Sequence, residues 1–405
     1  MRILWVGPNF LHPTTKGGQI RTLETLRELH QRHEIHYAAF TDPKHPEGIE
    51  RSAEYSSRSY PFHLRLADKR SPAFLGDLLG GLISPVPVAV KRFHTEEMSR
   101  FAAEALQAGR YDCVVCDFLA VAENFSQRQH VVLFQHNVES IIWRRRAEQA
   151  GVPQRAYLAL QARRMDAYER RVCRESQGVI AVSEEDASIM RDRFGLAPER
   201  VRAVPTGVDV EYFQPRGTPP PPSADLVFVG SMDWMPNEDG VQFFVREVLP
   251  LIRLHRRDCS VSVVGRNPSA SIRKLAAATP GLVVTGTVPD VRPYLWGARA
   301  SIVPLRIGGG TRLKIYESAA AGVPVISTRV GAEGLPLESG KECLLADSPQ
   351  DFAAACLRIL NESELRENLA AAAFDLVSSR FSWHVVASQF EDALLALAGR
   401  EGSHG

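Results

Sequence analysis

Short β-rich runs alternate with helical stretches along most of the chain, and this alternation is typical of parallel sheets wound with helices. The β-rich runs of the first half are residues 2–6, 34–40, 111–118, 130–136 and 178–183, with a helix expected over 18–32. Those of the second half are residues 225–230, 259–265, 281–288, 300–305, 322–328 and 342–347, with a helix expected over 237–255. We therefore predict an α/β fold with two doubly wound parallel sheets.

A run of prolines separates the two halves. Residues 217–223 read GTPPPPS, and consecutive prolines cannot join a helix or a central strand. With 405 residues, 44% of them hydrophobic, the chain is long enough for two domains of about 200 residues each. We predict domains over 1–215 and 224–380 with a linker at 216–223. A final helix, 381–398, could cap the second domain.

Charge and cysteine usage disfavour several classes of function. Lys and Arg total 48 against 47 for Asp and Glu, so overall charge favours neither nucleic acid nor an acidic polymer as a partner. Cys113 and Cys116 lie three apart in an expected strand and point to opposite faces, which disfavours a redox or zinc pair. Residues 2–6 are too short for a signal-peptide core, and no run of about 18 apolar residues occurs. We expect a cytoplasmic protein with at most peripheral membrane contact.

Residues 308–317, GGGTRLKIYE, combine a flexible backbone with two cations and one carboxylate. The glycines allow backbone N–H groups, including those of Gly309, Gly310 and Thr311, to approach an anion where a helix begins. Arg312 and Lys314 can neutralise phosphate charge, and Glu317 can accept hydrogen bonds from ribose hydroxyls. The pattern predicts a diphosphate-binding loop. The alternative is a glycine-rich surface turn before an ordinary amphipathic helix.

Ligands of open α/β sheets bind beyond the carboxyl ends of the strands, and candidate residues of both halves fall at such positions. They are Gly17, Gly18, Asp117 and His136 in the first half, and Ser231 and Gly265 in the second. We expect the two groups to face each other and form one site. Gly18 could instead be a turn glycine, His136 a satisfied structural histidine and Asp117 a helix cap.

Five segments, in order, resemble motifs of glycosyltransferase family 4, whose members are retaining enzymes of the GT-B fold that use nucleotide sugars. They are KGGQIR (16–21), VIAVSEEDA (179–187), VPTGVDVEYF (204–213), FVGSMDWMPN (228–237) and GGGTRLKIYE (308–317). The last resembles a branch found in exopolysaccharide clusters. The resemblance implies two Rossmann-like domains, a nucleotide-sugar donor and a final helix that packs back on the first domain. We favour a UDP-sugar over a GDP-sugar as the donor.

The resemblance also implies roles for particular residues. Gly18 would lie near the donor diphosphate and acceptor, His136 between donor sugar and acceptor, and Glu317 at the ribose. The first of the family's two glutamates is absent, because Gly309 occupies its position, which affects the sugar contacts. A lysine that many relatives place early in the donor domain is missing too. Arg266 could replace it, or Arg312 and Lys314 could suffice. Backbone near Val288 would hold the base.

The chemistry implied by the family needs no protein nucleophile, because the acceptor hydroxyl approaches the same face of the sugar from which the phosphate departs. The leaving phosphate then takes the acceptor's proton. Arg312, Lys314 and the neighbouring amides would stabilise charge on the leaving diphosphate. No Asp-x-Asp triplet occurs, so we expect no metal and no other cofactor, the nucleotide sugar being a substrate. The absence of a Walker-A loop and of a strand-linked GxGxxG disfavours an ATPase or a dehydrogenase.

Residues 144–174 hold nine arginines and three acidic residues. Such a helical stretch could lie on an anionic membrane, or it could be a solvated basic face. The apolar stretch 74–90 could receive a lipid-linked acceptor or belong to the core. We predict a retaining glycosyltransferase acting on a glycan or lipid-linked glycan in polysaccharide biosynthesis. The alternatives are a nucleotide-sugar 2-epimerase of the same fold and a non-catalytic binding member.

Overall fold

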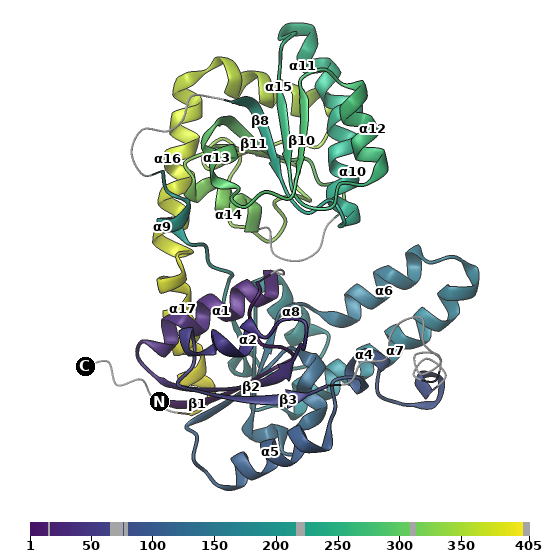
Figure 1. Ribbon diagram of the computed structural model, residues 1–405, viewed down its shortest axis with the longest axis vertical. Helices are drawn as coiled ribbons and strands as arrows, with labels where there is room; N and C mark the ends of the chain where they lie inside the picture. Colours follow the sequence, from purple (N-terminus) through teal and green to yellow (C-terminus); the bar gives the residue numbers. More distant parts are fainter. Residues whose placement is uncertain (15–16, 65–75, 77–79, 216–222, 308–312, 400–405) are drawn as a thin grey trace. The chain divides into compact units, whose positions relative to one another are not determined.

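The computed structural model describes residues 1–14, 17–64, 76, 80–215, 223–307 and 313–399 (Figure 1). The chain divides into two compact units, the first made of Met1–Pro205 with Val386–Gly405 and the second of Thr206–Val385. Each unit is built on its own parallel sheet. The predicted α/β class is therefore confirmed.

The first unit contains a seven-stranded sheet in the order β3-β2-β1-β4-β5-β6-β7. Its strands are β1 (Arg2–Gly7), β2 (Glu34–Thr41), β3 (Arg58–His63), β4 (Cys113–Asp117), β5 (Val132–Gln135), β6 (Gly178–Ala181) and β7 (Val201–Ala203). Sequence analysis did not predict the two edge strands. Strand β3 contains Pro61, which lacks a backbone N–H and is tolerated at an edge, and β7 has only three residues.

Helices follow most strands of this unit. They are α1 (Gly17–His30), α2 (Glu47–Glu50), α4 (Val88–Lys91), α5 (Glu96–Gln107), α6 (Glu139–Gln149), α7 (Val152–Glu175) and α8 (Glu184–Asp192). Helices α6 and α7 pack on each other as a hairpin that extends from the rest of the first unit (Figure 1). Short 3-10 turns, including Leu119–Asn124 after β4, complete the unit.

The last helix, α17 (Trp383–Leu397), contacts the sheet of the first unit. The ring centroid of Phe390 lies 5.4 Å from that of Trp5 and 4.9 Å from that of Phe134. The Glu391 carboxylate accepts a hydrogen bond of 2.8 Å from His33 Nε2. The division between the units therefore falls inside this helix, after Val385.

The second unit contains a six-stranded sheet in the order β10-β9-β8-β11-β12-β13. Its strands are β8 (Ala224–Val229), β9 (Val261–Val264), β10 (Leu282–Gly286), β11 (Ala298–Val303), β12 (Val325–Ser327) and β13 (Cys343–Leu345). Its helices are α9 (Val210–Phe213), α10 (Met235–Phe243), α11 (Leu249–His255), α12 (Ala270–Ala278), α13 (Arg292–Trp296), α14 (Leu313–Ala320), α15 (Pro349–Asn361) and α16 (Ser363–Arg380). A π-helical turn, Phe244–Val248, joins α10 to α11.

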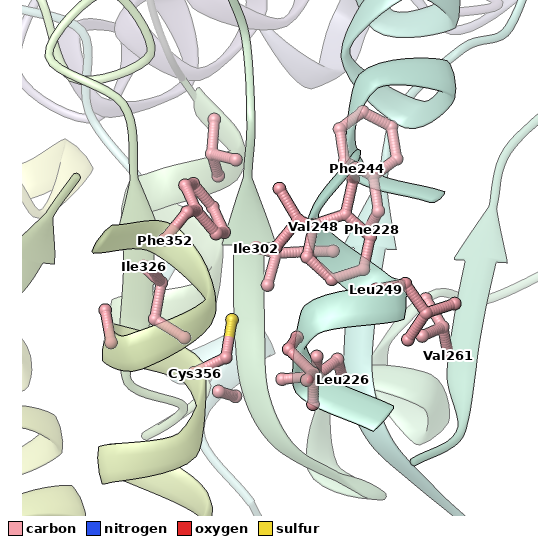
Figure 2. Close-up of a cluster of buried hydrophobic side chains, with 14 of the residues drawn as sticks. Leu226, Phe228, Phe244, Val248, Leu249, Val261, Ile302, Ile326, Phe352 and Cys356 are labelled. Atoms are coloured by element: carbon pink, nitrogen blue, oxygen red, sulfur yellow. The ribbon is translucent and has the colours of Figure 1, made fainter. Parts of the chain in front are cut away.

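Apolar side chains from the strands and helices of the second unit form one large core. Figure 2 shows Phe228 and Ile302 from β8 and β11 beside Phe244 and Val248 of the π-helical turn, with Phe352 of α15 nearby. All five side chains are at most 1% exposed. Burying apolar area at about 25 cal/mol per Å² makes such a cluster the main source of stability. The core thus fixes the strand ends that carry the candidate residues.

The observed division lies before the linker predicted at 216–223, of which 216–222 lie outside the described residues. Phe213 explains the difference. Its side chain is buried in a cluster that includes Tyr316 of α14, and its carbonyl accepts a hydrogen bond of 2.8 Å from Trp296 Nε1. Residues 206–213 therefore pack as part of the second unit.

Candidate active site

A polar cluster lies where β4 and β5 of the first unit end. Asp117 is the last residue of β4, and His136 directly follows β5. The apolar residues of β4 and β5 lie in the core of the first unit, so the polar residues at the ends of these strands are buried as well. Asp117 is 1% exposed and His136 is 3% exposed. Buried polar groups of this kind require partners.

Asp117 accepts hydrogen bonds from three side chains. Its Oδ2 atom accepts from Thr22 Oγ1 at 2.8 Å and from Trp5 Nε1 at 3.1 Å, and its Oδ1 atom lies 2.6 Å from His136 Nε2. The 3-10 helix that follows β4 begins after Phe118 without a side-chain cap. The interpretation of Asp117 as a helix cap is therefore wrong, and the residue instead connects β1, α1 and His136.

His136 has partners at both ring nitrogens. Its Nδ1 atom lies 2.9 Å from Arg21 Nη1, and its ring stacks on Phe118 with a centroid distance of 3.7 Å and an interplanar angle of 4°. Burial lowers the pKa of His136 against the opposing effect of Asp117, and Arg21 lowers it further. A substrate could contact a ring nitrogen only by displacing Asp117 or Arg21.

Gly17 and Gly18 begin α1, and Gly17 is exposed. A Cβ atom at Gly18 would lie only 2.6 Å from Phe118 Cζ and 3.5 Å from His136 Nδ1. Glycine is needed at this position because the Phe118 ring packs against the helix. Packing against Phe118 is thus one reason for glycine at position 18, and the predicted approach of a ligand is another. The sequence alone could not distinguish the two reasons.

Arg21, which the sequence patterns did not single out, completes the cluster. The side chain lies on α1 and is 5% exposed, and burial lowers its pKa to about 10 against the opposing effects of Asp117 and Asp186. One signal was present in the sequence, since Arg21 lies four residues before Thr25 on a face that also buries Leu29. A cation on that face needs a buried partner.

The second unit brings Lys314 to the end of β8. Lys314 Nζ donates a hydrogen bond of 2.7 Å to Asn237 Oδ1 and lies 4.4 Å from the ring centroid of Phe228. A Cβ atom at Gly230 would lie 2.9 Å from this Nζ atom. The cation is therefore held at the strand-end edge where we expected a phosphate site. Asn237, at the start of α10, was not singled out from the sequence.

Ser231, Gly265 and Arg266 lie at the same edge. Arg266 Nε donates a hydrogen bond of 2.9 Å to Ser231 Oγ and lies 3.7 Å from Asp233 Oδ2. A Cβ atom at Gly265 would lie 1.9 Å from the Gly230 carbonyl oxygen, so this glycine is required by backbone packing between strand ends. The structure thus brings these three residues together beside the end of β8.

Glu317 lies on α14 three residues after Lys314 and is half-buried. Burial raises the pKa of its carboxyl group to about 7, with Lys314 opposing the shift. No hydrogen bond from a described residue reaches this carboxylate. A half-buried carboxylate that receives no hydrogen bond from the described residues is suited to accept hydrogen bonds from ligand hydroxyls.

Of the remaining donor-side candidates, Val288 alone lies in the described part of the chain. Val288 is half-buried in the loop between β10 and α13, where it packs on the cluster that contains Tyr316. Gly309, Gly310, Thr311 and Arg312 lie outside the described residues. Over the described ranges, no group of three or more His, Cys, Asp or Glu side chains is arranged to hold a metal ion.

The arginine-rich stretch 144–174 forms most of the hairpin of α6 and α7. The Glu169 carboxylate fixes its base by accepting hydrogen bonds from the backbone N–H groups of Glu139 and Ser140, at 2.7 and 2.9 Å. The exposed arginines are Arg144, Arg145, Arg146, Arg155, Arg163, Arg171 and Arg174. In the described parts of the chain, no helix has both the length and the apolar content needed to cross a membrane.

The two units, each built on a parallel sheet with helices, have the architecture of GT-B proteins, as a comparison with solved structures shows. A solved glycosyltransferase from Rickettsia africae is similar with a TM-score of 0.69 and 15% identity, covering 99% of each chain. The Anabaena protein HepE, solved in complex with UDP-glucose, gives a TM-score of 0.68 with 13% identity, covering 97% of this chain and 99% of its own. The predicted GT-B fold is thereby confirmed.

Two protein-family models match the chain, one over each half. The model described as Glycosyltransferase Family 4 matches residues 15–212, and the model described as Glycosyl transferases group 1 matches residues 223–362. The chain belongs to glycosyltransferase family 4. The family resemblance drawn from the five sequence segments is confirmed.

Curated relatives are more similar in sequence than these solved structures but match over only part of their length. A D-inositol 3-phosphate glycosyltransferase from Nocardioides sp. is 28% identical over 251 residues, covering 55% of this chain and 54% of its own. An MMP alpha-(1->4)-mannosyltransferase from Mycolicibacterium hassiacum is 27% identical over 243 residues, covering 57% of each. The chain spans about half the length of the curated relatives it matches.

Proposed function

We propose that the protein transfers a sugar from a nucleotide-sugar donor, with UDP favoured as the nucleotide, to a glycan or lipid-linked glycan in polysaccharide biosynthesis. The observation that carries this proposal is the placement of Lys314 and Glu317 on one helix, with Lys314 held at the end of β8. A cation and a carboxylate so placed suit the phosphate and the ribose of one nucleotide. HepE, of the same fold, is solved with UDP and with UDP-glucose, which supports the choice of donor.

The proposed reaction retains the configuration of the sugar. The acceptor oxygen forms a bond to the anomeric carbon on the face from which the diphosphate leaves, and the departing phosphate oxygen takes the acceptor's proton. Lys314, with the sequence candidates Arg312 and the amides of 309–311, stabilises the charge that grows on the diphosphate. We assign the acceptor side to the first unit and require no metal.

The first test is a thermal denaturation series of the full chain with UDP, GDP and their sugars. A ligand at about 100 times its Kd stabilises the folded state by about 2.7 kcal/mol. We expect UDP and a UDP-sugar to raise the melting temperature, and unchanged melting with every nucleotide would contradict the proposal.

The stabilising donor is then incubated with glycan acceptors in EDTA. Sugar transfer with retained configuration supports the proposal, and transfer that requires added Mn²⁺ or Mg²⁺ contradicts its metal-independent part. Epimerisation of the donor without acceptor, or binding without any turnover, would favour the two alternative functions.

We also propose that the hairpin of α6 and α7 binds the surface of an anionic membrane peripherally, without crossing it. Exposed arginines lie along both helices, and Val152, near the hairpin turn, is 86% exposed. Part of this charge is used within the protein, because Asp166 pairs with Arg170 at 3.0 Å and with Arg144 at 3.9 Å. Arg155 and Arg163 form no ion pair with any described residue and are the better lipid contacts.

Replacing both Arg155 and Arg163 by Glu is expected to lower binding to vesicles that contain phosphatidylserine, since each basic residue near such a surface contributes about 1 kcal/mol. Co-sedimentation with the vesicles measures the effect. UDP binding by the same variant serves as the control and should not change. Equal sedimentation of variant and wild type would leave the hairpin as a solvated basic face.

A further inference from the structure

We propose that Arg21 is a positioning residue that holds His136 in its neutral tautomer, with the proton on Nε2 and the ring fixed against Phe118. The proposal deepens the proposed function, because it defines what His136 can do in sugar transfer. The evidence for the tautomer and for the ring position comes only from contacts within the first unit.

The hydrogen bonds of the cluster determine the tautomer. A guanidinium group can only donate, so the 2.9 Å contact from Arg21 Nη1 requires His136 Nδ1 to accept. The single ring proton then lies on Nε2, which donates to Asp117 Oδ1 at 2.6 Å. Asp117 is kept in place by Thr22 and Trp5, so the direction of the whole chain of hydrogen bonds is set.

Charges around the ring have opposite effects on its protonation. Arg21 on α1 opposes an imidazolium, and Asp117 at the end of β4 favours one. Asp186 on α8 acts on Arg21, while Tyr37 on β2 interacts with Asp117. Without Arg21, a proton could enter at Nδ1, and the resulting imidazolium would pair with Asp117. Burial has the largest effect against the imidazolium, and Arg21 adds to it by occupying Nδ1 with a donor of like charge.

Packing fixes the ring plane as well. Phe118 has a φ angle of 71°, in the left-handed region that is costly for an aromatic residue, and this backbone carries its ring onto His136. Gly18 leaves the space that the Phe118 ring occupies. A neutral ring held in this way has no proton on Nδ1 to give. It is consistent with a reaction in which the acceptor's proton goes to the leaving phosphate.

The experiment is a pH titration of ¹⁵N-histidine-labelled full-length protein by NMR, in which His136→Gln identifies the His136 signals. In the wild type, between about pH 6 and 8, we expect Nε2 to be protonated and Nδ1 to be unprotonated. In Arg21→Met, the midpoint of His136 should rise by about 1 pH unit or more. Arg21→Lys should retain the wild-type tautomer, because lysine is also a cationic donor.

Arg27→Met is the matched control, since Arg27 lies on the same helix but pairs with Glu24 and Glu54. It should leave the His136 signals unchanged. Protonation of Nδ1 in the wild type at neutral pH, or an unchanged midpoint in Arg21→Met, would overturn the proposal. If Arg21→Met does not fold, the tautomer in the wild type and in Arg21→Lys still decides the matter.

Activity provides a second and separate readout. At saturating UDP-sugar, which removes the effect of Glu317 on donor affinity, turnover by Arg21→Met should fall as the pH drops through its raised His136 midpoint, whereas wild-type turnover should show no such step. The titration needs no donor. A failed proposed function and a failed role for Arg21 can therefore be told apart.

Discussion

The strand-end clusters of the two units differ in how their polar groups are satisfied. In the first unit, Arg21, Asp117 and His136 are at most 5% exposed and are joined by hydrogen bonds. In the second, Glu317 is half-buried and receives no hydrogen bond from a described residue, although Lys314 lies one helical turn before it. The first cluster is a completed internal network, and the second is suited to receive a ligand.

This difference shows that a polar residue at the carboxyl end of a strand is not by itself a ligand contact. Burial and existing partners determine whether it positions other groups or binds directly. We expect substitutions in the first cluster to affect mainly folding and ring geometry. Substitutions in the second should affect mainly nucleotide binding.

The largest expected effect is that of Asp117→Ala on stability. The variant leaves the Trp5 indole, the Thr22 hydroxyl and His136 Nε2 without their acceptor. It also removes a negative charge that favours the buried Arg21 cation, and together these losses cost about 3–5 kcal/mol. Urea denaturation followed by fluorescence measures the change. The control is Asp192→Ala, which removes an exposed carboxylate from α8 and should have little effect. Equal stability of the two variants would break the proposed contrast between the clusters.

Glu317→Gln should have the next largest effect, on binding rather than on stability. Replacing a charged acceptor by a neutral one weakens binding of UDP-glucose, used as a probe, by about 1–3 kcal/mol. Calorimetric titration gives the affinity, and Glu333→Gln, at an exposed position of the same unit, is the control. An unchanged affinity in Glu317→Gln would remove this carboxylate from the nucleotide site.

A smaller effect is expected from pH. Burial raises the pKa of Glu317 to about 7, so its ionised form is lost as the pH falls through that value. If the carboxylate binds ribose hydroxyls, UDP-glucose affinity rises between pH 6 and 8 by about tenfold at most, because the ionised fraction grows by that factor. The diphosphate diester does not titrate in this range. Glu317→Gln should show a flat profile, and an equally flat wild type would contradict the assignment.

Most of the fold could be predicted from the sequence. Alternation of β-rich and helical runs gave eleven of the thirteen strands, and the helix expected over 237–255 is observed as α10, the π-helical turn and α11. The missed strands, β3 and β7, lie at the edges of the first sheet, where strands are short or interrupted by proline. Each pairs with the strand that precedes it in the chain, so the reason lies in their own residues: a three-residue strand and a strand interrupted by proline carry too weak a pattern.

The candidate residues were predicted less completely than the fold. Strand-end position identified Asp117, His136, Ser231 and Gly265, because parallel strands bring their carboxyl ends to one edge. The same rule could not identify Arg21 or show that both ring nitrogens of His136 are occupied. Side-chain partners depend on which helix face packs on the sheet. Sequence motifs therefore identify the sheet edge at which candidate residues lie, but their side-chain contacts can be determined only from the folded structure.

The central claim is that the second unit binds the donor nucleotide through the end of β8 and the helix α14. Hydrogen–deuterium exchange of the full chain, with and without UDP-glucose, tests it most directly. We expect slower exchange in peptides covering residues 228–240 and 313–320, and loss of that protection in Glu317→Gln. Unchanged exchange in those peptides at saturating UDP-glucose, with protection confined to residues 17–30 and 113–140 of the first unit, would contradict the account.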